Sequence, residues 1–428
     1  MVLSVNAEYS YYNDRSTHES AFVVEIPSLS KYYSTDEILG LTSTTLLAGR
    51  PSLPRQQVDL LTGATSVAGV NFALQNRDGA IDAIVSEGLL EREVKVWQGF
   101  RGMRWSNFVL RHTGLIQKPQ LDRTGTAYSI SVGGRLSQLD KVRFRPEDMA
   151  AEKSTGAGAT KVWTKTMTTG RTVKLTLTAA DNQALFNQAQ LEGSPFDIFL
   201  CLMLSGSSSA REENFLPVWT SAGLTENEVD TASWLAAAEL WQIWQVRWLI
   251  REEQNLKSFC EKEIMRLVGG YMVQRADGKI GVRVPVFPRF TDATLQTLDD
   301  GAILEQPDFG EDSKNLISHV RFSFDWDGSS FLTELPRMAT PLWLSGDVRV
   351  EKVHVIESTG LQTSLGAMLV VQILLASLFQ RFGIAPRPVR LDLGLNNQLL
   401  EAGDAVKVQS SLYPNADFGK QRGASAIR

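Results

Sequence analysis

The chain has 428 residues, of which 43% are hydrophobic and 21% charged, a composition typical of globular proteins with sizeable cores. At this length we expect about two to four domains rather than a single core. The 43 basic and 48 acidic residues give a net charge of −5, which offers no electrostatic reason to expect an extended nucleic-acid-binding surface.

The first residues, MVLSVNAEYSYYNDRS, lack the basic and apolar regions of a signal peptide. The longest apolar stretch, residues 366–379, is shorter than the roughly 20 residues that span a bilayer, and Gln372 interrupts it. We therefore expect this stretch to form a core helix. We also expect a protein without a membrane-spanning segment that is soluble and intracellular when it is synthesised.

Residues 1–150 alternate between apolar and polar side chains in several segments that end at Gly or Asp turns. This period predicts strands, and their spacing predicts a small antiparallel barrel or sandwich with long loops. The apolar faces that we expect are Val70, Phe72 and Leu74; Val94, Val96 and Gln98; and Tyr128, Ile130 and Val132.

The next stretch, 151–181, combines a small polar segment with the alternating residues of RTVKLTLT, and we interpret it as a linker and connecting strand. Residues 182–310 predict an insertion domain with helices and a β-hairpin. Ser194 and Pro195 begin one helix, and an apolar stripe from Leu256 to Leu267 predicts another that stops at Gly269. The Asp-Gly turn of RADGK then predicts the hairpin.

Residues 311–428 return to strand patterns around the apolar helix, with Val320, Phe322, Phe324 and Trp326 on one predicted face. Further strands are predicted at 353–355, 389–395 and 406–408. The fold class that we predict is α+β and mainly β. Two antiparallel β-barrel-like domains, 1–150 and 311–428, would enclose the helical-plus-hairpin insertion.

The cysteines and histidines carry no signature of a catalytic or metal site. Both cysteines, Cys201 and Cys260, lie in apolar patterns and are interpreted as buried structural thiols. The four histidines, His18, His112, His319 and His354, are too far apart in sequence to form a paired metal motif. We assign structural or surface roles to His112, His319 and His354, which lie in strand-like segments.

Three further patterns point weakly to chemistry. The segment GAGATK, residues 156–161, lacks the spacing of a phosphate-binding loop. The adjacent carboxylates Asp299-Asp300 and Glu252-Glu253 point apart in regular structure, so we interpret them as solvated charges. Five Trp residues between Trp219 and Trp248 suggest either core packing, which the alternation favours, or a stacking platform. We therefore name no catalytic, cofactor-binding or metal-binding residue, and we expect neither an enzyme nor a cofactor.

Three segments together resemble the tail hub proteins of tailed bacteriophages and gene transfer agents. The central one is VDTASWLAAAELWQIWQVRWLIREEQNLKSFCEKEIMRLVGGYMVQRADGKIGVRVPVF, with an early aspartate, a strand, a helix and a hairpin around Asp-Gly-Lys. The segment RFGIAPRPVRLDLGLNNQLLEAGDAVKV looks like the closing barrel, and VAGVNFALQNRDGAIDAIV followed by VKVWQGF looks like the first barrel. The likeness covers roughly residues 60–410 and is one of hydrophobic spacing and turns.

This resemblance implies a structural virion protein at the tail tip, synthesised in the cytoplasm of a bacterial host. Hub proteins form a homotrimeric ring that matches the sixfold tail tube to threefold tip components. Their partners are the tail tube or distal tail protein, the tape measure protein, and fibre, spike or other baseplate proteins. DNA passes transiently through the central channel. The fibre-carrying region of long hubs has no counterpart in this sequence, so we expect separate proteins to bind the receptor.

Three alternatives remain open. The chain could be a distal tail ring or another baseplate protein, which a copy number of six would separate from a hub with three. It could be a tail-associated glycan or peptidoglycan hydrolase whose acids lie far apart in sequence. It could also be a glycan-binding protein that uses Trp219 or Trp241.

Overall fold

The structure is a computed structural model in which most of the chain is described. The described residues are 7–13, 19–53, 55–59, 61–76, 79, 81–86, 88–121, 125–149, 160–179, 186–204, 222–284, 295–303, 308–309, 315–346, 351–383, 389–391, 400, 405–414 and 422–427.

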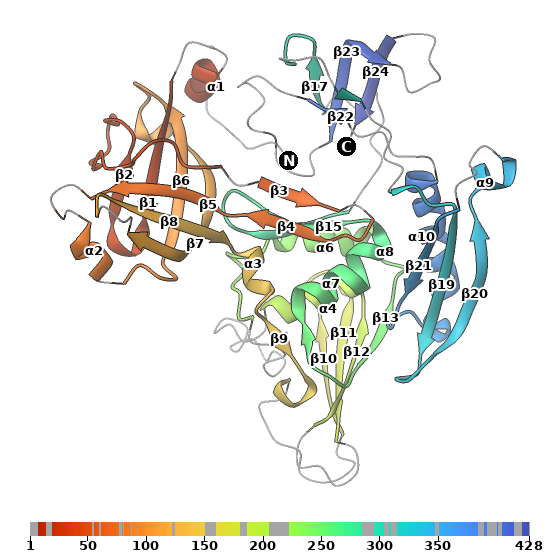
Figure 1. Ribbon diagram of the computed structural model, residues 1–428. Helices are drawn as coiled ribbons and strands as arrows, with labels where there is room; N and C mark the ends of the chain where they lie inside the picture. The colour runs from red at the N-terminus through yellow and green to blue at the C-terminus, as the bar shows by residue number, and fades with distance from the viewer. Residues whose placement is uncertain are drawn as a thin grey trace.

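The chain is α+β and mainly β, which confirms the predicted fold class. Figure 1 shows an N-terminal sheet at the left, a central group of strands and helices, and a C-terminal sheet at the right. The expected division at residues 150, 181 and 310 stays a prediction.

The N-terminal part is built on a six-stranded antiparallel sheet in the order β2-β1-β6-β7-β8-β5. The predicted alternation is confirmed here, because the apolar faces listed above are buried in β5, β6 and β8. The strands are β1 (Ser20–Ile26), β2 (Lys31–Ser34), β5 (Val70–Gln75), β6 (Glu93–Phe100), β7 (Val109–Leu121) and β8 (Ala127–Gly134).

Residues 44–48 close this sheet into a barrel. On one side the Thr44 N–H donates to the Tyr32 carbonyl (2.9 Å). On the other side the Gln75 N–H donates to the Leu46 carbonyl (2.7 Å), and the Ala48 N–H donates to the Ala73 carbonyl (2.8 Å). The two edge strands β2 and β5 are thus joined through this segment, and apolar side chains such as Phe22, Val96 and Ile130 fill the interior.

The outer face of β1 and β6 carries a second apolar cluster beneath the short helix α1 (Ala7–Asn13). The rings of Tyr9 and Phe100 lie 5.3 Å apart in it. Barrel strands alternate between inside and outside, so this cluster explains why β1 is apolar on both faces.

A two-stranded arm leaves the barrel between residues 55 and 68. It consists of β3 (Arg55–Val58) and β4 (Thr65–Ala68), which pair antiparallel. Figure 1 shows this arm reaching across the centre of the molecule. The Gln56 side chain donates to the Met272 carbonyl in the central part (2.9 Å). The sequence patterns did not predict this arm.

The central part contains a four-stranded antiparallel sheet in the order β10-β11-β12-β13. Its backbone pairing joins strands on both sides of the expected boundary at residue 181. The strands are β10 (Thr160–Thr166), β11 (Thr172–Thr178), β12 (Gln188–Gly193) and β13 (Val246–Ile250). Helices α4 (Pro195–Leu204) and α6 (Thr231–Leu240) pack with it.

The core-packing interpretation of the tryptophans is confirmed for the described ones that alternate. Trp234, Trp244 and Trp248 are completely buried, and Trp241 is 9% exposed. Phe196 lies between two of them, with its ring 6.0 Å from that of Trp244 and 6.4 Å from that of Trp234. Trp219 lies outside the described residues.

A helix at residues 256–268, here called the junction helix, runs through the middle of the molecule. It comprises α7 (Leu256–Cys260), a π-helical turn, η5 (Glu261–Met265), and α8 (Arg266–Val268). Its predicted apolar stripe is buried, and Gly269 ends it with a φ of 59°. The predicted hairpin follows as β15 (Tyr271–Gln274) and β16 (Ile280–Arg283), whereas the π-helical turn had no counterpart in the sequence prediction.

The C-terminal part contains the sheet β20-β19-β21, covered on one face by the predicted apolar helix α10 (Ala367–Phe382). The strands are β19 (His319–Trp326), β20 (Phe331–Ala339) and β21 (Val353–Glu357). The buried residues of α10 belong to the same hydrophobic cluster as the central sheet and the junction helix, so these two parts share one core.

A smaller sheet, β17-β23-β24, is formed by segments that precede β19 and follow α10 in the sequence. Its strands are β17 (Gln296–Asp299), β23 (Val406–Pro414) and β24 (Arg422–Ile427). Two strand pairs, β19 with β21 and β17 with β23, are parallel, unlike the antiparallel pairing expected for this region. β20 runs back along β19 and ends opposite His319, where β21 also begins, so the return along β20 makes the parallel pairing of β19 with β21 possible.

The remaining elements are short. They include α2 (Asp82–Ser86), α3 (Leu136–Leu139), α9 (Pro341–Ser345), β9 (Arg143–Phe144) paired with β14 (Gln254–Asn255), and β18 (Asp308–Phe309) paired with β22 (Val389–Arg390).

Substitution of Gly63 in the arm tests how tightly the arm packs on the junction helix. Its φ is 70°, and an added Cβ would lie 2.6 Å from the Met265 Cβ and 2.8 Å from the Arg266 backbone nitrogen. We expect Gly63→Ala to lower the free energy of unfolding by roughly 2–5 kcal/mol, because backbone strain adds to the clash. Gly40→Ala is the control, since Gly40 has a φ of 81° with nothing within 4 Å. Equal losses in urea denaturation would contradict this packing.

Candidate functional site

The two cysteines are buried, as the sequence predicts. Burial raises the pKa of Cys201 to about 12 and raises that of Cys260 well above its usual value. A thiol that keeps its proton is a poor nucleophile, so neither side chain has the character of a catalytic cysteine.

Two described histidines, His319 and His354, lie on the neighbouring strands β19 and β21, one register position apart, so their side chains point to opposite faces of that sheet. His112 is on β7, and burial lowers its pKa to about 4. His354 is on β21 with its pKa lowered to about 4, mainly by burial, and burial also lowers the pKa of His319. His18 lies outside the described residues. Within the described ranges, no group of three His, Cys, Asp or Glu residues is placed to hold a metal ion.

The carboxylate pairs are also separated. Glu252 lines a surface cleft, whereas the Glu253 carboxylate lies 3.6 Å from the Arg143 guanidinium. Asp299 accepts hydrogen bonds from the Gly301 and Ala302 N–H groups (both 3.0 Å) and therefore caps a turn. Residues 156–159 of the glycine-rich segment lie outside the described residues.

The strongest convergence of polar side chains occurs on the junction helix. A Glu261 side-chain oxygen accepts a hydrogen bond from the Thr65 N–H of the arm (2.9 Å). The Lys257 ammonium lies 3.9 Å from the same carboxylate and 3.2 Å from that of Asp140. Burial is the largest influence on the pKa of Glu261 and raises it. This side of the helix is therefore fastened to the barrel and its arm.

Glu263 fastens the opposite side of the junction helix and is 2% exposed. Its Oε2 accepts hydrogen bonds from the Trp248 indole N–H (3.3 Å) and from the Thr359 N–H (3.1 Å). Burial raises the pKa of this carboxyl group. One side chain thereby connects the central sheet, the junction helix and the segment that leads to α10.

Two arginines complete the junction. Arg266 on α8 donates to the Val355 carbonyl of β21, and Arg381 on α10 donates to the Gly269 carbonyl (2.7 Å). Both contacts tie the end of the junction helix to the C-terminal part. The sequence analysis did not single out these residues, although Glu263 falls on the apolar stripe, three residues after Cys260 and four after Phe259. A carboxylate at such a position is a detectable signal of a buried polar contact.

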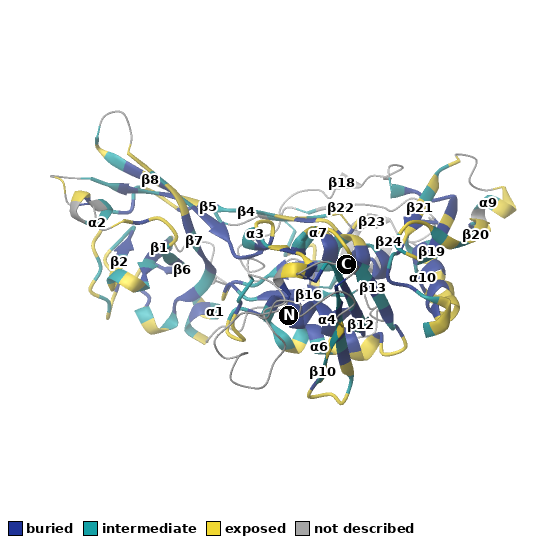
Figure 2. Cartoon of the chain, turned by 90° about the horizontal axis from the view of Figure 1, so that it is seen from below, coloured by how far each residue is buried: buried dark blue, intermediate teal, exposed yellow. Residues whose placement is uncertain are grey.

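A different kind of surface lies on the outer face of α10. Met368, Leu369 and Ile373 are 42%, 56% and 39% exposed, and residues 367–380 include no charged side chain. Figure 2 shows exposed positions alternating with buried ones along this helix. The prediction of a core helix is thus confirmed for one face only. An exposed apolar surface of this kind is typical of sites of protein association.

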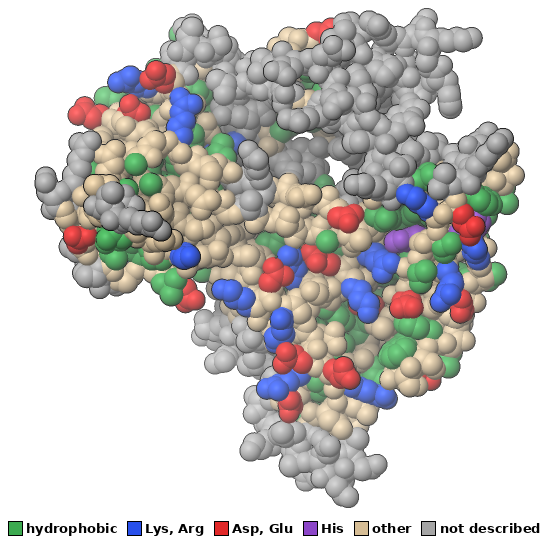
Figure 3. Space-filling view, in the orientation of Figure 1, with side chains coloured by type: hydrophobic (Ala, Val, Ile, Leu, Met, Phe, Trp, Pro, Cys, Tyr) green, Lys and Arg blue, Asp and Glu red, His purple; other side chains and the backbone are tan. Residues whose placement is uncertain are grey.

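The charged side chains show a contrasting distribution. On the face seen in Figure 3, Lys and Arg are interspersed with Asp and Glu over the central part. Among the helices described, none has both the length and the apolar character needed to cross a membrane.

Glu263→Gln tests the buried carboxylate. The raised pKa means that the folded state holds this proton more tightly than the unfolded state, so the stabilisation is present at low pH and is lost as pH rises through the folded-state pKa. Gln keeps an acceptor oxygen and does not ionise. We expect the variant to gain stability relative to the original chain as pH rises from 4 to 8, measured by urea denaturation.

Glu334→Gln is the control for this experiment because it removes a glutamate whose side chain is 57% exposed. The buried histidines titrate in the original chain and in both variants, so their contributions to the pH dependence of stability cancel when the proteins are compared. A stability difference for Glu263→Gln that stays constant across this range would contradict an ionised carboxylate buried at the junction.

No family model matches the chain, and no curated protein matches it in sequence. Among solved structures, the chain is similar to a tail protein from Neisseria meningitidis, with 12% identity, a TM-score of 0.40, and coverage of 91% of this chain and 86% of that one. It is similar to a 43 kDa tail protein of prophage MuSo2 from Shewanella oneidensis (9% identity, TM-score 0.37, coverage 91% and 88%). A prophage tail protein from Listeria monocytogenes is a third (10% identity, TM-score 0.39, coverage 95% and 88%). These values are too low for the likeness to assign a function.

Proposed function

We propose that the chain is a structural protein of a phage-type tail, the hub of the tail tip or baseplate. Three copies would form a ring that adapts the sixfold tail tube to threefold tip components and surrounds the DNA channel. The protein would act through its shape, without catalysis or a cofactor.

The observation that carries this proposal is the exposed apolar face of α10. Burying Met368, Leu369 and Ile373 against a partner would remove apolar surface from water without leaving a charge unpaired. The helix is backed by a core that continues into the central part, so a partner would meet a preformed surface. We infer that a second copy of the chain covers this face.

The threefold ring and the other partners rest on the sequence resemblance to tail hubs. On this proposal the remaining surfaces contact the tail tube or distal tail protein, the tape measure protein, and fibre, spike or other baseplate proteins. The protein would be made in the host cytoplasm and end up at the tail tip of the virion.

The charge distribution suits a channel that DNA passes through without binding. The net charge is −5, and the face in Figure 3 carries both signs interspersed. Tight DNA binding would require several lysines and arginines aligned with phosphates, which would make release slow.

The mass in solution tests the ring. We expect the full chain to behave as a species of three times 47.4 kDa in multi-angle light scattering at micromolar concentration. Leu369→Asp should shift the mass to that of one chain, because it places a charge in the apolar contact. Leu240→Asp is the matched control, since Leu240 is 53% exposed and Leu369 is 56% exposed.

A single-chain mass for the unmodified protein across the concentration range would contradict the trimer. A species of six chains would instead favour the distal tail ring. If Leu369→Asp still forms a trimer, the ring is supported, but α10 is not the contact between its subunits.

A further inference from the structure

A cleft of about 320 Å³ lies between the central and C-terminal parts. Its walls are the end of β13, the start of the junction helix, the turn after β19 and the segment at Thr359. This volume is at the lower end of the range for small-molecule sites in proteins. The cleft is separate from the outer face of α10, and the proposed tail function does not use it.

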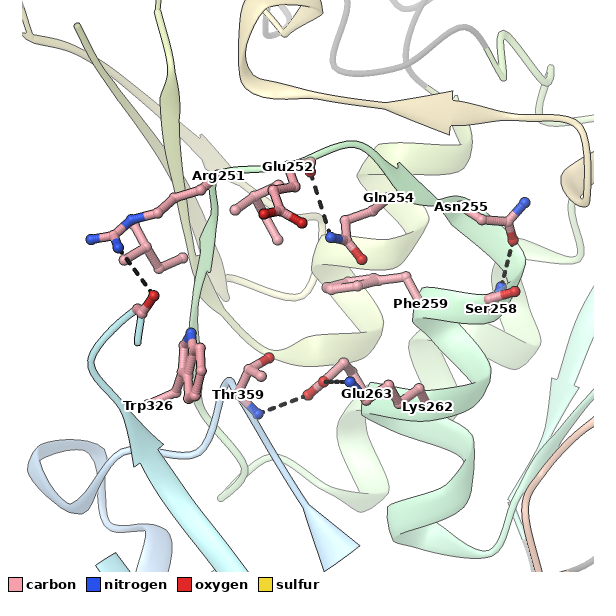
Figure 4. A pocket seen from close by; sticks show the side chains of 13 residues that line it. Arg251, Glu252, Gln254, Asn255, Ser258, Phe259, Lys262, Glu263, Trp326 and Thr359 are labelled. Carbon is pink, nitrogen blue, oxygen red and sulfur yellow. Dashed lines mark hydrogen bonds and ion pairs between the residues drawn. The ribbon is translucent and has the colours of Figure 1, made fainter. Parts of the chain in front are cut away.

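Two aromatic rings form apolar walls of the cleft. Phe259 is held by the Trp248 ring at 4.9 Å and the Phe144 ring at 5.5 Å, and Trp326 is held by the Phe331 ring at 4.8 Å. Figure 4 shows the Phe259 ring extending toward the middle of the cleft and the Trp326 indole standing at its side. These rings are positioned by packing that exists without a ligand.

Polar side chains approach the same space from opposite sides. In Figure 4, Glu252 and Gln254 enter from one side and Glu263 and Thr359 from the other. Glu263 uses Oε2 for Trp248 and Thr359, whereas its Oε1 has the Lys262 ammonium at 3.9 Å. This oxygen therefore has capacity to accept a hydrogen bond from a ligand.

The charges lining the cleft balance. Arg251 and Lys262 supply two cations, and Glu252 and Glu263 supply two carboxyl groups. A strongly anionic ligand would meet the carboxylates, and a strongly cationic one would meet the Arg and Lys side chains. An apolar ligand would cover these polar groups without satisfying them, which costs free energy.

We propose that this cleft binds a neutral saccharide unit of a glycan. Each sugar hydroxyl both donates and accepts, so a single ring can satisfy the carboxyl groups of Glu252 and Glu263 as well as the Gln254 amide. The apolar C–H face of the ring can pack on Phe259 or Trp326. A neutral, polyhydroxylated ligand is the chemical class that uses all of these groups together.

Binding can be measured with the full chain on an array of neutral oligosaccharides built from glucose, galactose, mannose and N-acetylglucosamine. The best binder is then titrated by calorimetry. We expect Glu252→Ala and Gln254→Ala each to weaken binding about tenfold, since each removes a hydrogen bond to the sugar. The tryptophan fluorescence of the unmodified chain should change on titration, because Trp326 lines the cleft.

Glu253→Ala is the matched control, because this neighbouring carboxylate pairs with Arg143 and does not line the cleft. It should bind as the unmodified chain does. Absence of binding to every neutral sugar up to about 10 mM would overturn the proposal. Equal loss in Glu252→Ala and Glu253→Ala would also overturn it. So would binding of peptides, but not sugars, that depends on Glu252.

Discussion

The structure depends on two carboxylates of the junction helix, the half-buried Glu261 and the buried Glu263, each finding partners in a different neighbour. Both residues lie in the π-helical turn η5, two positions apart. Glu261 meets the Thr65 N–H of the arm, while Glu263 meets Trp248 and Thr359. A buried carboxylate without such partners would cost several kcal/mol. These contacts couple the burial of the junction helix to both the barrel arm and the C-terminal part.

The same contact also fixes the surface that we assign to assembly. Thr359 lies a few residues before α10, and in between the Asp325 side chain accepts a hydrogen bond from the Thr363 N–H (2.6 Å). At its other end, α10 is held by Arg381 on Gly269. The orientation of the apolar face of α10 is therefore set by the junction helix. The two proposed surfaces, the helix face and the cleft, share a support but differ in chemistry.

Local sequence patterns were sufficient to predict the strands, helices and turns that are determined by residues close together in the sequence. The alternation in β5, β6 and β8, the stripe from Leu256 to Leu267 and the hairpin around Asp277 were all readable because strand and helix periods are local. The burial of Trp244 and Trp248 followed from the same alternation. The arm, the closure at residues 44–48 and the partners of Glu263 were not readable, because they join residues far apart in sequence. The cleft was missed for that reason, since its walls come from three separate segments.

Closure of the barrel has a consequence for the behaviour of many copies at high local concentration. Over residues 44–48 the backbone groups at the two sheet margins are occupied within the same chain. An exposed margin would offer a template on which further chains could add strand by strand into fibrils. With that template sealed over these residues, further copies cannot add there through backbone hydrogen bonds, and a contact at this margin has to be made by side chains.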